Sequence, residues 1–267
     1  MNGRQKFQSF SSDFARSESE SQFPGLWKGL ETIYSPSLGV NGNRLIDYKQ
    51  KLDITFDNDL PVWDNGVNNG SSILFNGSLI CSSISRTWGF SVDCSICAWI
   101  KTTTSGLAIC SLGHDASDDE AMIYVSGGGN GAIFNHNSPG NYSVKESDSS
   151  VITDKWIFVV GCINGSYNSL KIFINGREEA GSYSEAGTPS DISDSTERIL
   201  KIGGRTYVTG GENFIGNIGD VLVYSRVLKP QEITQLYLGQ TPLVKRVRKK
   251  MGVTPTSSEF CFGQNVD

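Results

Sequence analysis

The stretch FIGNIGDVLVYSRVLKPQEITQLYL, residues 214–238, decides the fold. Its first half has the period-two pattern of a β-strand, and its second half reads as a short helix that Pro230 opens and Gly239 ends. Both predicted strand faces are partly apolar, which is typical of a central strand that leads into a capping helix. The predicted faces are Ile218, Asp220, Leu222 and Tyr224 on one side, and Gly219, Val221 and Val223 on the other.

Working outward from this strand, the rest of the chain reads as short strands separated by turns. Two turns stand out: Asn175-Gly176 suits the positive φ angles of a type I′ hairpin, and the glycine-rich run 127–131 reads as a second hairpin tip. No alternation of strands with long helices is visible, so a parallel sheet is not expected. The further predicted strands are 72–75, 90–101, 121–126, 132–135, 155–163, 170–174 and 199–203.

The composition fits one globular all-β domain with extensions at both ends. The 267 residues are 37% hydrophobic and 19% charged, and they include 30 glycines. We divide the chain into an N-terminal arm (1–22), a β-sandwich (23–240) and a basic C-terminal tail (241–267). The formal net charge of −5 makes nucleic acid an unexpected partner.

The two ends differ in character from the body. The arm is polar with isolated Phe7, Phe10 and Phe14, which predicts docking onto a partner. The tail carries +3 on an otherwise acidic chain, and we expect it to anchor the protein to neighbouring subunits, with phosphate contact as the alternative. Its basic residues are Lys245, Arg246, Arg248, Lys249 and Lys250.

The cysteines are predicted to be structural and reduced. Six cysteines at scattered spacings do not form a disulfide framework. Cys94 and Cys97 lie on a predicted strand, where residues three apart face opposite sides and cannot share a metal. The N-terminus lacks the apolar core of a secretory signal, and no stretch is long and apolar enough for a membrane helix. These features predict a protein that is made in a cytoplasm and is not exported by the general secretory route, without a membrane partner.

Three segments in this order resemble the laminin G-like group of concanavalin A-like jelly rolls. They are FSVDCSICAWIK (90–101), KWIFVV (155–160) with LKIFINGR (170–177), and LKIGG (200–204) with the stretch 214–238. The resemblance covers about residues 70–238. It implies an all-β, two-sheet antiparallel jelly-roll sandwich with one short C-terminal helix, to which our reading adds extended terminal arms.

A second, shorter resemblance concerns the leader. Residues 24–39 and the short basic tail are similar to segments that flank such domains in bacteriophage and virus-like sequences. This resemblance implies a virion protein, assembled in the host cytoplasm, with capsid or tail proteins as partners and a homo-oligomeric state.

Candidate catalytic groups are few. Glycosidases of this fold class use paired carboxylates that face each other, whereas Glu178 and Glu179 are adjacent and therefore predicted on opposite faces. His114 and His136 lie in polar stretches, where we expect solvated loop histidines rather than members of a triad. We therefore expect no enzyme activity and no catalytic residues.

Two kinds of binding site remain open. Many laminin G-like domains bind calcium at one rim, and the resemblance makes this cation possible here, although one acidic position familiar in the family is Gly219 in this chain. Otherwise no cofactor is expected. The candidate calcium ligands are Asp115, Asp118 and Asp119, or Asn217 with Asp220. Candidate sugar-binding aromatics in predicted loops are Tyr142, Tyr167, Tyr183 and Tyr207.

The leading hypothesis is a non-enzymatic structural protein of a bacteriophage particle, as a capsid decoration or in a fibre or tail. Its sandwich faces outward, its arms tether it, and it has a possible affinity for host surface glycans. The alternative is a lectin-like adhesion module, and a glycoside hydrolase of the same fold is more distant.

Overall fold

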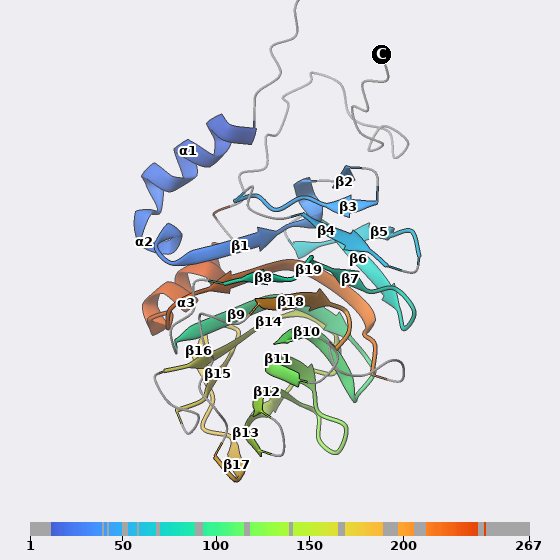
Figure 1. Cartoon of the computed structure of the whole chain (residues 1–267), viewed down its shortest axis with the longest axis vertical. Coiled ribbons are helices and arrows are strands. Elements are labelled where there is room, and N and C mark those ends of the chain that lie inside the picture. Colours follow the sequence, from blue (N-terminus) through green and yellow to red (C-terminus); the bar gives the residue numbers. More distant parts are fainter. Residues whose placement is uncertain are drawn as a thin grey trace, which may run out of the picture.

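The computed structural model contains two stacked antiparallel β-sheets (Figure 1). It describes residues 12–38, 40–41, 43–49, 53–57, 59–67, 70–88, 93–114, 118–138, 141–164, 169–188, 197–205, 212–239 and 243. The predicted jelly-roll architecture is confirmed. No helix within these ranges is long and apolar enough to cross a bilayer.

Sheet A has eight strands. They are β1 (Leu30–Tyr34), β5 (Val62–Asn65), β6 (Ser71–Asn76), β9 (Cys94–Thr102), β14 (Thr153–Ile163), β15 (Lys171–Ile174), β16 (Arg177–Glu178) and β19 (Ile215–Tyr224). Their order is β16-β15-β14-β9-β19-β6-β5, and β1 also pairs with β19. The final strand β19 is therefore central, as its two apolar faces predict.

Sheet B has eleven strands. They are β2 (Val40–Asn41), β3 (Arg44–Leu45), β4 (Ile54–Phe56), β7 (Cys81–Ser82), β8 (Arg86–Thr87), β10 (Leu107–His114), β11 (Asp118–Val125), β12 (Gly131–Ser138), β13 (Asn141–Ser150), β17 (Ser182–Ala186) and β18 (Glu197–Ile202). The order is β17-β13-β12-β11-β10-β18-β7-β4-β3-β2, and β8 pairs with β18. The glycine-rich hairpin between β11 and β12 forms as predicted.

The main core fills the space between the two sheets. Phe134 of β12 reaches across so closely that a Cβ on Gly161 of β14 would lie 2.2 Å from its ring. His136, also in β12, is 1% exposed. The expectation of a solvated loop histidine is therefore wrong: the polar residues around His136 belong to a strand, and alternation turns this side chain away from solvent.

A second core lies on the outer face of sheet A. It is formed where two helices, α2 (Pro24–Trp27) and α3 (Pro230–Leu238), pack on the strands β1, β9, β14 and β19. A third helix, α1 (Ser12–Gln22), precedes α2, and a 3-10 turn η1 (Pro36–Leu38) follows β1. Helix α3 confirms the predicted short C-terminal helix.

The N-terminal arm differs from the expectation over half its length, because residues 12–22 form a helix. Ser19 is fully buried and its Oγ accepts a hydrogen bond from Trp27 Nε1 at 3.1 Å. Arg16 Nη1 donates to the Lys49 carbonyl oxygen at 3.1 Å. These contacts attach α1 to the sandwich.

The cysteine prediction is confirmed for the described residues. Cys94 belongs to the main core and Cys97 to the second core, so the two thiols lie on opposite faces of sheet A. Burial raises the pKa of Cys110 to about 12 and that of Cys162 to about 11. These two thiols therefore stay protonated and unreactive at neutral pH.

Strand β19 contains a β-bulge that the simple alternation pattern did not predict. Ile218 pairs with Ile100 and Val221 pairs with Ala98, which leaves one extra residue in β19. Ile218 consequently faces the main core together with Val221 and Val223, not the outer face. At this bulge the same edge of β19 changes partner from β6 to β1.

Candidate functional site

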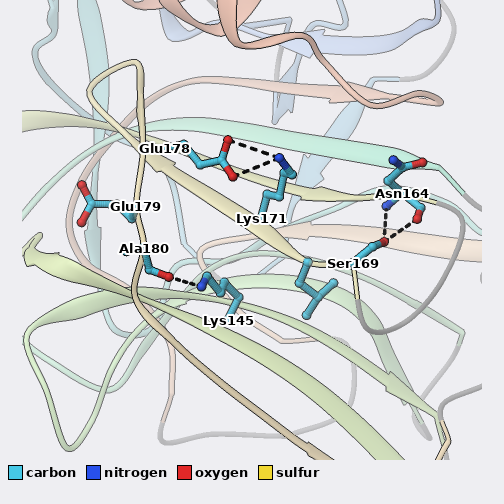
Figure 2. Close-up of a pocket in the computed structure, with 8 residues that line it drawn as sticks. Lys145, Asn164, Ser169, Lys171, Glu178, Glu179 and Ala180 are labelled. Atoms are coloured by element: carbon cyan, nitrogen blue, oxygen red, sulfur yellow. Dashed lines mark hydrogen bonds and ion pairs between the residues drawn. The ribbon is translucent and has the colours of Figure 1, made fainter.

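A pocket of about 340 Å³ opens between the edges of the two sheets, where β13 of sheet B approaches β15 of sheet A (Figure 2). Its wall comes from β13, the β14–β15 connection, β15 and the segment that begins in β16. The lining residues are Lys145, Asn164, Ser169, Leu170, Lys171, Glu178, Glu179 and Ala180.

The hairpin of β15 and β16 places one wall. Asn175 and Gly176 adopt φ angles of 50° and 81°, so they form the tight turn that the Asn-Gly pair predicts. The turn brings Glu178 back beside Lys171, whose Nζ lies 3.0 Å from Glu178 Oε1 and 3.2 Å from Oε2. Because both side chains are nearly half exposed, this ion pair orients the groups and adds little stability.

The opposite wall is tied to this hairpin by hydrogen bonds between the sheets. Lys145 Nζ donates to the carbonyl oxygens of Ala180 and Gly181. Glu179 accepts hydrogen bonds from the backbone N–H of Ser149 at 2.9 Å and from its hydroxyl at 3.1 Å. The polar groups of the pocket are thus held in place before a ligand arrives.

The chemistry of the pocket is that of binding. Leu170 is almost fully buried and provides an apolar floor, while Asn164, Ser169 and Lys171 supply hydrogen-bonding groups. The carboxylates of Glu178 and Glu179 point in opposite directions, one toward Lys171 and the other away (Figure 2). They cannot act as the facing acid and base of a glycosidase.

The four predicted tyrosines do not form one site. Tyr183 is in β17 directly opposite Lys145, so it lies on the pocket's side of sheet B, and it is 40% exposed. Its hydroxyl donates to Glu185 Oε2 at 2.7 Å. Tyr142 is in β13, three residues before Lys145 and therefore on the opposite face, and it is 42% exposed. Both were expected in loops, but each lies in a strand.

The remaining two tyrosines, Tyr167 and Tyr207, lie outside the described residues. So do the predicted anchors Phe7, Phe10, Lys245, Arg246, Arg248, Lys249 and Lys250. Phe14 lies in α1, with its side chain outside the described part. The tail prediction is therefore open, although Leu243 at its start is fully buried in the second core.

Of the calcium candidates, the structure describes the side chains of Asn217 and Asp220, and both make hydrogen bonds to other side chains. Asn217 Nδ2 donates to Asp64 Oδ2 at 3.0 Å and to Ser72 Oγ at 3.3 Å. Asp220 accepts a hydrogen bond from the Ser35 hydroxyl. Asp115 and the side chains of Asp118 and Asp119 lie outside the described part. Within that part, no three His, Cys, Asp or Glu side chains group as metal ligands.

Most of the pocket was not predicted from the sequence, because its residues come from separated segments. The one available signal was the Asn175-Gly176 turn, which fixes the hairpin register and so sets Glu178 beside Lys171. Asn164 and Ser169 carry no such signal. Their place depends on how the two sheets stack.

These features define a two-sheet jelly-roll sandwich with a preformed polar pocket at its open edge. The chain belongs to the concanavalin A-like lectin/glucanases superfamily, whose family model matches residues 62–234. This match confirms the fold resemblance seen in the sequence. No curated protein matches the chain.

Solved structures share the fold at low sequence identity. Domain 4 of AbnA, an extracellular arabinanase from Geobacillus stearothermophilus solved with arabinotriose, has a TM-score of 0.61 and 17% identity over 78% of this chain and 98% of that domain. A second structure comes from botulinum neurotoxin type C, a toxin whose cell entry depends on interaction with two ganglioside molecules. It has a TM-score of 0.58 and 14% identity over 84% of this chain.

A Trypanosoma rangeli sialidase solved as a covalent intermediate has a TM-score of 0.54 and 16% identity over 87% of this chain. This chain spans 53% of the neurotoxin type C structure and 38% of the sialidase. The sandwich therefore occurs both in binding domains and within glycoside hydrolases. Membership of the superfamily does not by itself separate the two classes.

Proposed function

We propose that this protein is a non-catalytic carbohydrate-binding β-sandwich. The observation that carries the proposal is the pocket, in which fixed hydrogen-bonding groups surround an apolar floor next to the exposed ring of Tyr183. Sugars present hydroxyl groups around apolar C–H faces, and such a pocket matches both. The divergent carboxylates of Glu178 and Glu179 support binding without hydrolysis.

Binding to an array of glycans tests this function, with arabino-oligosaccharides and gangliosides included because the structural neighbours were solved or studied with them. We expect Tyr183→Ala and Lys171→Met each to weaken binding by about tenfold, equivalent to the loss of one good contact. Tyr142→Ala is the matched control, since Tyr142 has nearly the same exposure on the opposite face. Equal losses for Tyr183→Ala and Tyr142→Ala contradict this assignment.

The proposal includes no bound metal or other cofactor at the pocket. Its hydrogen-bonding groups are two lysines, an amide, a hydroxyl and two carboxylates that are already paired. Glycan affinity is therefore expected to be the same with excess EDTA and with added calcium. A loss of binding in EDTA that calcium restores contradicts a metal-free site.

A second candidate function is that of a structural protein on a bacteriophage particle, with the sandwich outward and the chain ends as tethers. It is favoured by the attachment of α1 to the sandwich, because this helix is the second half of the N-terminal arm and its hydrogen bonds hold it in a defined position. On this hypothesis the partners are capsid or tail proteins, and removal of residues 244–267, which keeps the buried Leu243, prevents incorporation into particles. Normal co-sedimentation of the truncated chain with particles contradicts the tether.

The two candidates are compatible, because an outward module of a particle can also bind host glycans. Hydrolysis of any array glycan, measured by release of reducing sugar and lost in Glu178→Gln, contradicts the non-enzymatic assignment.

A further inference from the structure

Two charged residues that line the pocket, Lys171 and Glu178, form one ion pair (Figure 2). Lys171 Nζ lies 3.0 Å from Glu178 Oε1 and 3.2 Å from Oε2. The two side chains are 47% and 45% exposed, so solvent and a ligand can reach both. An exposed ion pair of this kind stabilises a fold little, which leaves its charged groups available for binding.

The hydrogen-bonding capacity of this pair is not exhausted by its own contact. An ammonium group has three N–H donors and no acceptor, whereas an ionised carboxylate has several acceptor sites and no donor. The contacts with Glu178 occupy at most two of the three N–H groups of Lys171. Both carboxylate oxygens also keep a further lone pair. The pair therefore presents a free donor beside free acceptors.

A ligand that meets both groups at once must accept a hydrogen bond at one atom and donate one from the next. A hydroxyl group can do either, whereas a phosphate or carboxylate oxygen accepts only and an ammonium group donates only. Two hydroxyls on neighbouring carbons of a sugar ring lie about 3 Å apart, roughly the length of a hydrogen bond. This spacing matches the separation of Lys171 Nζ and the Glu178 oxygens. The pair is thus complementary to a vicinal diol.

The charges of the pocket favour an uncharged ligand. Its lining side chains include two ammonium groups, of Lys145 and Lys171, and two carboxylates, of Glu178 and Glu179, so their formal charges sum to zero. The acid group of an acidic sugar would compete with Glu178 for Lys171 and would lie near both carboxylates. Like charges brought together in this way select against such a ligand.

The rest of the pocket suits the end of a glycan. Leu170 is 6% exposed and supplies apolar surface for the C–H groups of a sugar. Asn164 brings an amide that can both donate and accept. Ser169 holds its backbone, because the Asn164 N–H donates to Ser169 Oγ at 3.0 Å and the Ser169 hydroxyl donates to the Asn164 carbonyl oxygen. A volume of about 340 Å³ is at the lower end for ligand pockets and suits a short ligand.

We propose that the Lys171–Glu178 ion pair binds two neighbouring hydroxyl groups of an uncharged sugar at the end of a glycan. Lys171 Nζ donates to one hydroxyl, and a Glu178 oxygen accepts from the other. This inference rests on the proposed carbohydrate-binding function and narrows its ligands to neutral sugars with a free vicinal diol.

An array of neutral glycans, each accompanied by forms that lack one hydroxyl of the terminal sugar, tests the proposal on the full-length chain. Loss of either hydroxyl of one vicinal pair should weaken binding by about tenfold, and loss of any other hydroxyl by less than about twofold. Matched glycans that end in an acidic sugar should bind more weakly than the neutral forms.

Variants assign each hydroxyl to its partner through a double-mutant cycle. Lys171→Met should weaken binding of the intact glycan by about tenfold and leave affinity for one of the two deoxy forms unchanged. Glu178→Ala should do the same with the other deoxy form. Glu20→Ala is the matched control, because Glu20 also belongs to an ion pair and its side chain is 41% exposed in α1. It should bind every form like the wild type.

A further variant separates this contact from general damage to the pocket. Tyr183→Ala should weaken binding of all forms by the same factor and so preserve their order. If circular dichroism shows that Glu178→Ala is misfolded, Glu178→Gln keeps an acceptor oxygen and should weaken binding less than Lys171→Met does.

Glycan binding that tolerates the loss of every single hydroxyl overturns the inference and leaves the proposed function intact. Preference for acidic terminal sugars has the same meaning, and so does an equal loss of affinity for intact and deoxy forms in Lys171→Met. A chain that binds no glycan overturns both the inference and the proposed function.

Discussion

The outer face of sheet A is covered at one end and bare at the other. At the covered end, Trp99 of β9 packs on Phe158 and Tyr237 with ring-centroid distances of 4.9 Å and 5.7 Å. At the bare end, Val62 and Leu74 present the same kind of apolar surface to solvent. The difference lies in the segments near the chain ends, because α2, β1 and α3 all contribute apolar side chains to the covered end. Helices α2 and α3 are thus part of the core of this domain.

The largest expected effect comes from removing the central aromatic ring of the covered end. Trp99→Ala should lower the free energy of unfolding by about 3–5 kcal/mol, because it leaves a cavity beneath α3. Leu74→Ala at the bare end should cost less than about 1 kcal/mol, since that side chain is already exposed. Urea denaturation of both variants measures the contrast, and similar losses at both ends contradict it.

The next effect concerns the backbone of β19 at the bare end. Gly216 has φ 134°, and an added Cβ would lie 2.4 Å from the Lys101 carbonyl oxygen. Gly216→Ala should therefore lower the free energy of unfolding by about 2–3 kcal/mol. Gly128→Ala is the control, because a Cβ there meets nothing within 4 Å. Thermal and urea unfolding that leave the two variants equal would rule out this steric explanation.

A smaller effect is expected at the border between the two ends. Ser35 is fully buried and donates a hydrogen bond to Asp220 at the bulge, where β19 changes partner. Ser35→Ala should cost about 1–2 kcal/mol, because a buried carboxylate loses a donor. The exposed Ser184→Ala serves as the comparison and should be neutral in the same urea titration.

The smallest effect is dependent on pH and lies at the covered end. Partial burial opposes ionisation of Glu232, but hydrogen bonds from Arg226 and from the Lys229 N–H outweigh it, so the pKa of this carboxyl lies below its ordinary value of 4.5. Its contribution is therefore present above pH 4.5 and is lost as pH falls through the lower, folded-state pKa.

The Glu232→Gln variant measures that contribution. It should be less stable than the wild type by about 1 kcal/mol at neutral pH, because the paired contacts of Arg226 at 2.7 Å and 2.9 Å lose their charge. The difference should shrink in urea titrations at progressively lower pH. A difference that grows on acidification has the wrong sign for this ion pair.

Much of the architecture was predictable from the sequence, because local patterns determine it. The Asn175-Gly176 turn, helix α3, and the opposite facing of Cys94 and Cys97 each follow from a few neighbouring residues. The bulge in β19 could not be predicted in this way. It lies where β19 changes its partner strand, and the alternation of residues within β19 carries no information about its partners. His136 was misplaced because its polar neighbours look like a loop.

Helix α1 was missed for a different reason. Its sequence is polar, so hydrophobic periodicity gives no signal, and its attachment depends on Trp27 and Lys49, which come later in the chain. The available clue was the spacing of Arg16 and Glu20, which are four residues apart in the sequence. In the structure Arg16 Nε lies 2.9 Å from Glu20 Oε1. The pocket was less accessible still, since it combines side chains from both sheets.

The pairing of β1 with β19 has a consequence for how the protein is made. Leu30 aligns with Tyr224, so β1 can form its pairing only after the much later strand β19 has been synthesised. Until the ribosome has released β19, sheet A lacks its middle and β6 has no inner neighbour. The strands β1 and β6 therefore lack this partner until β19 has been synthesised, and contacts this distant in sequence form slowly. We therefore expect the nascent chain to bind chaperones during translation, because its unpaired strands are exposed.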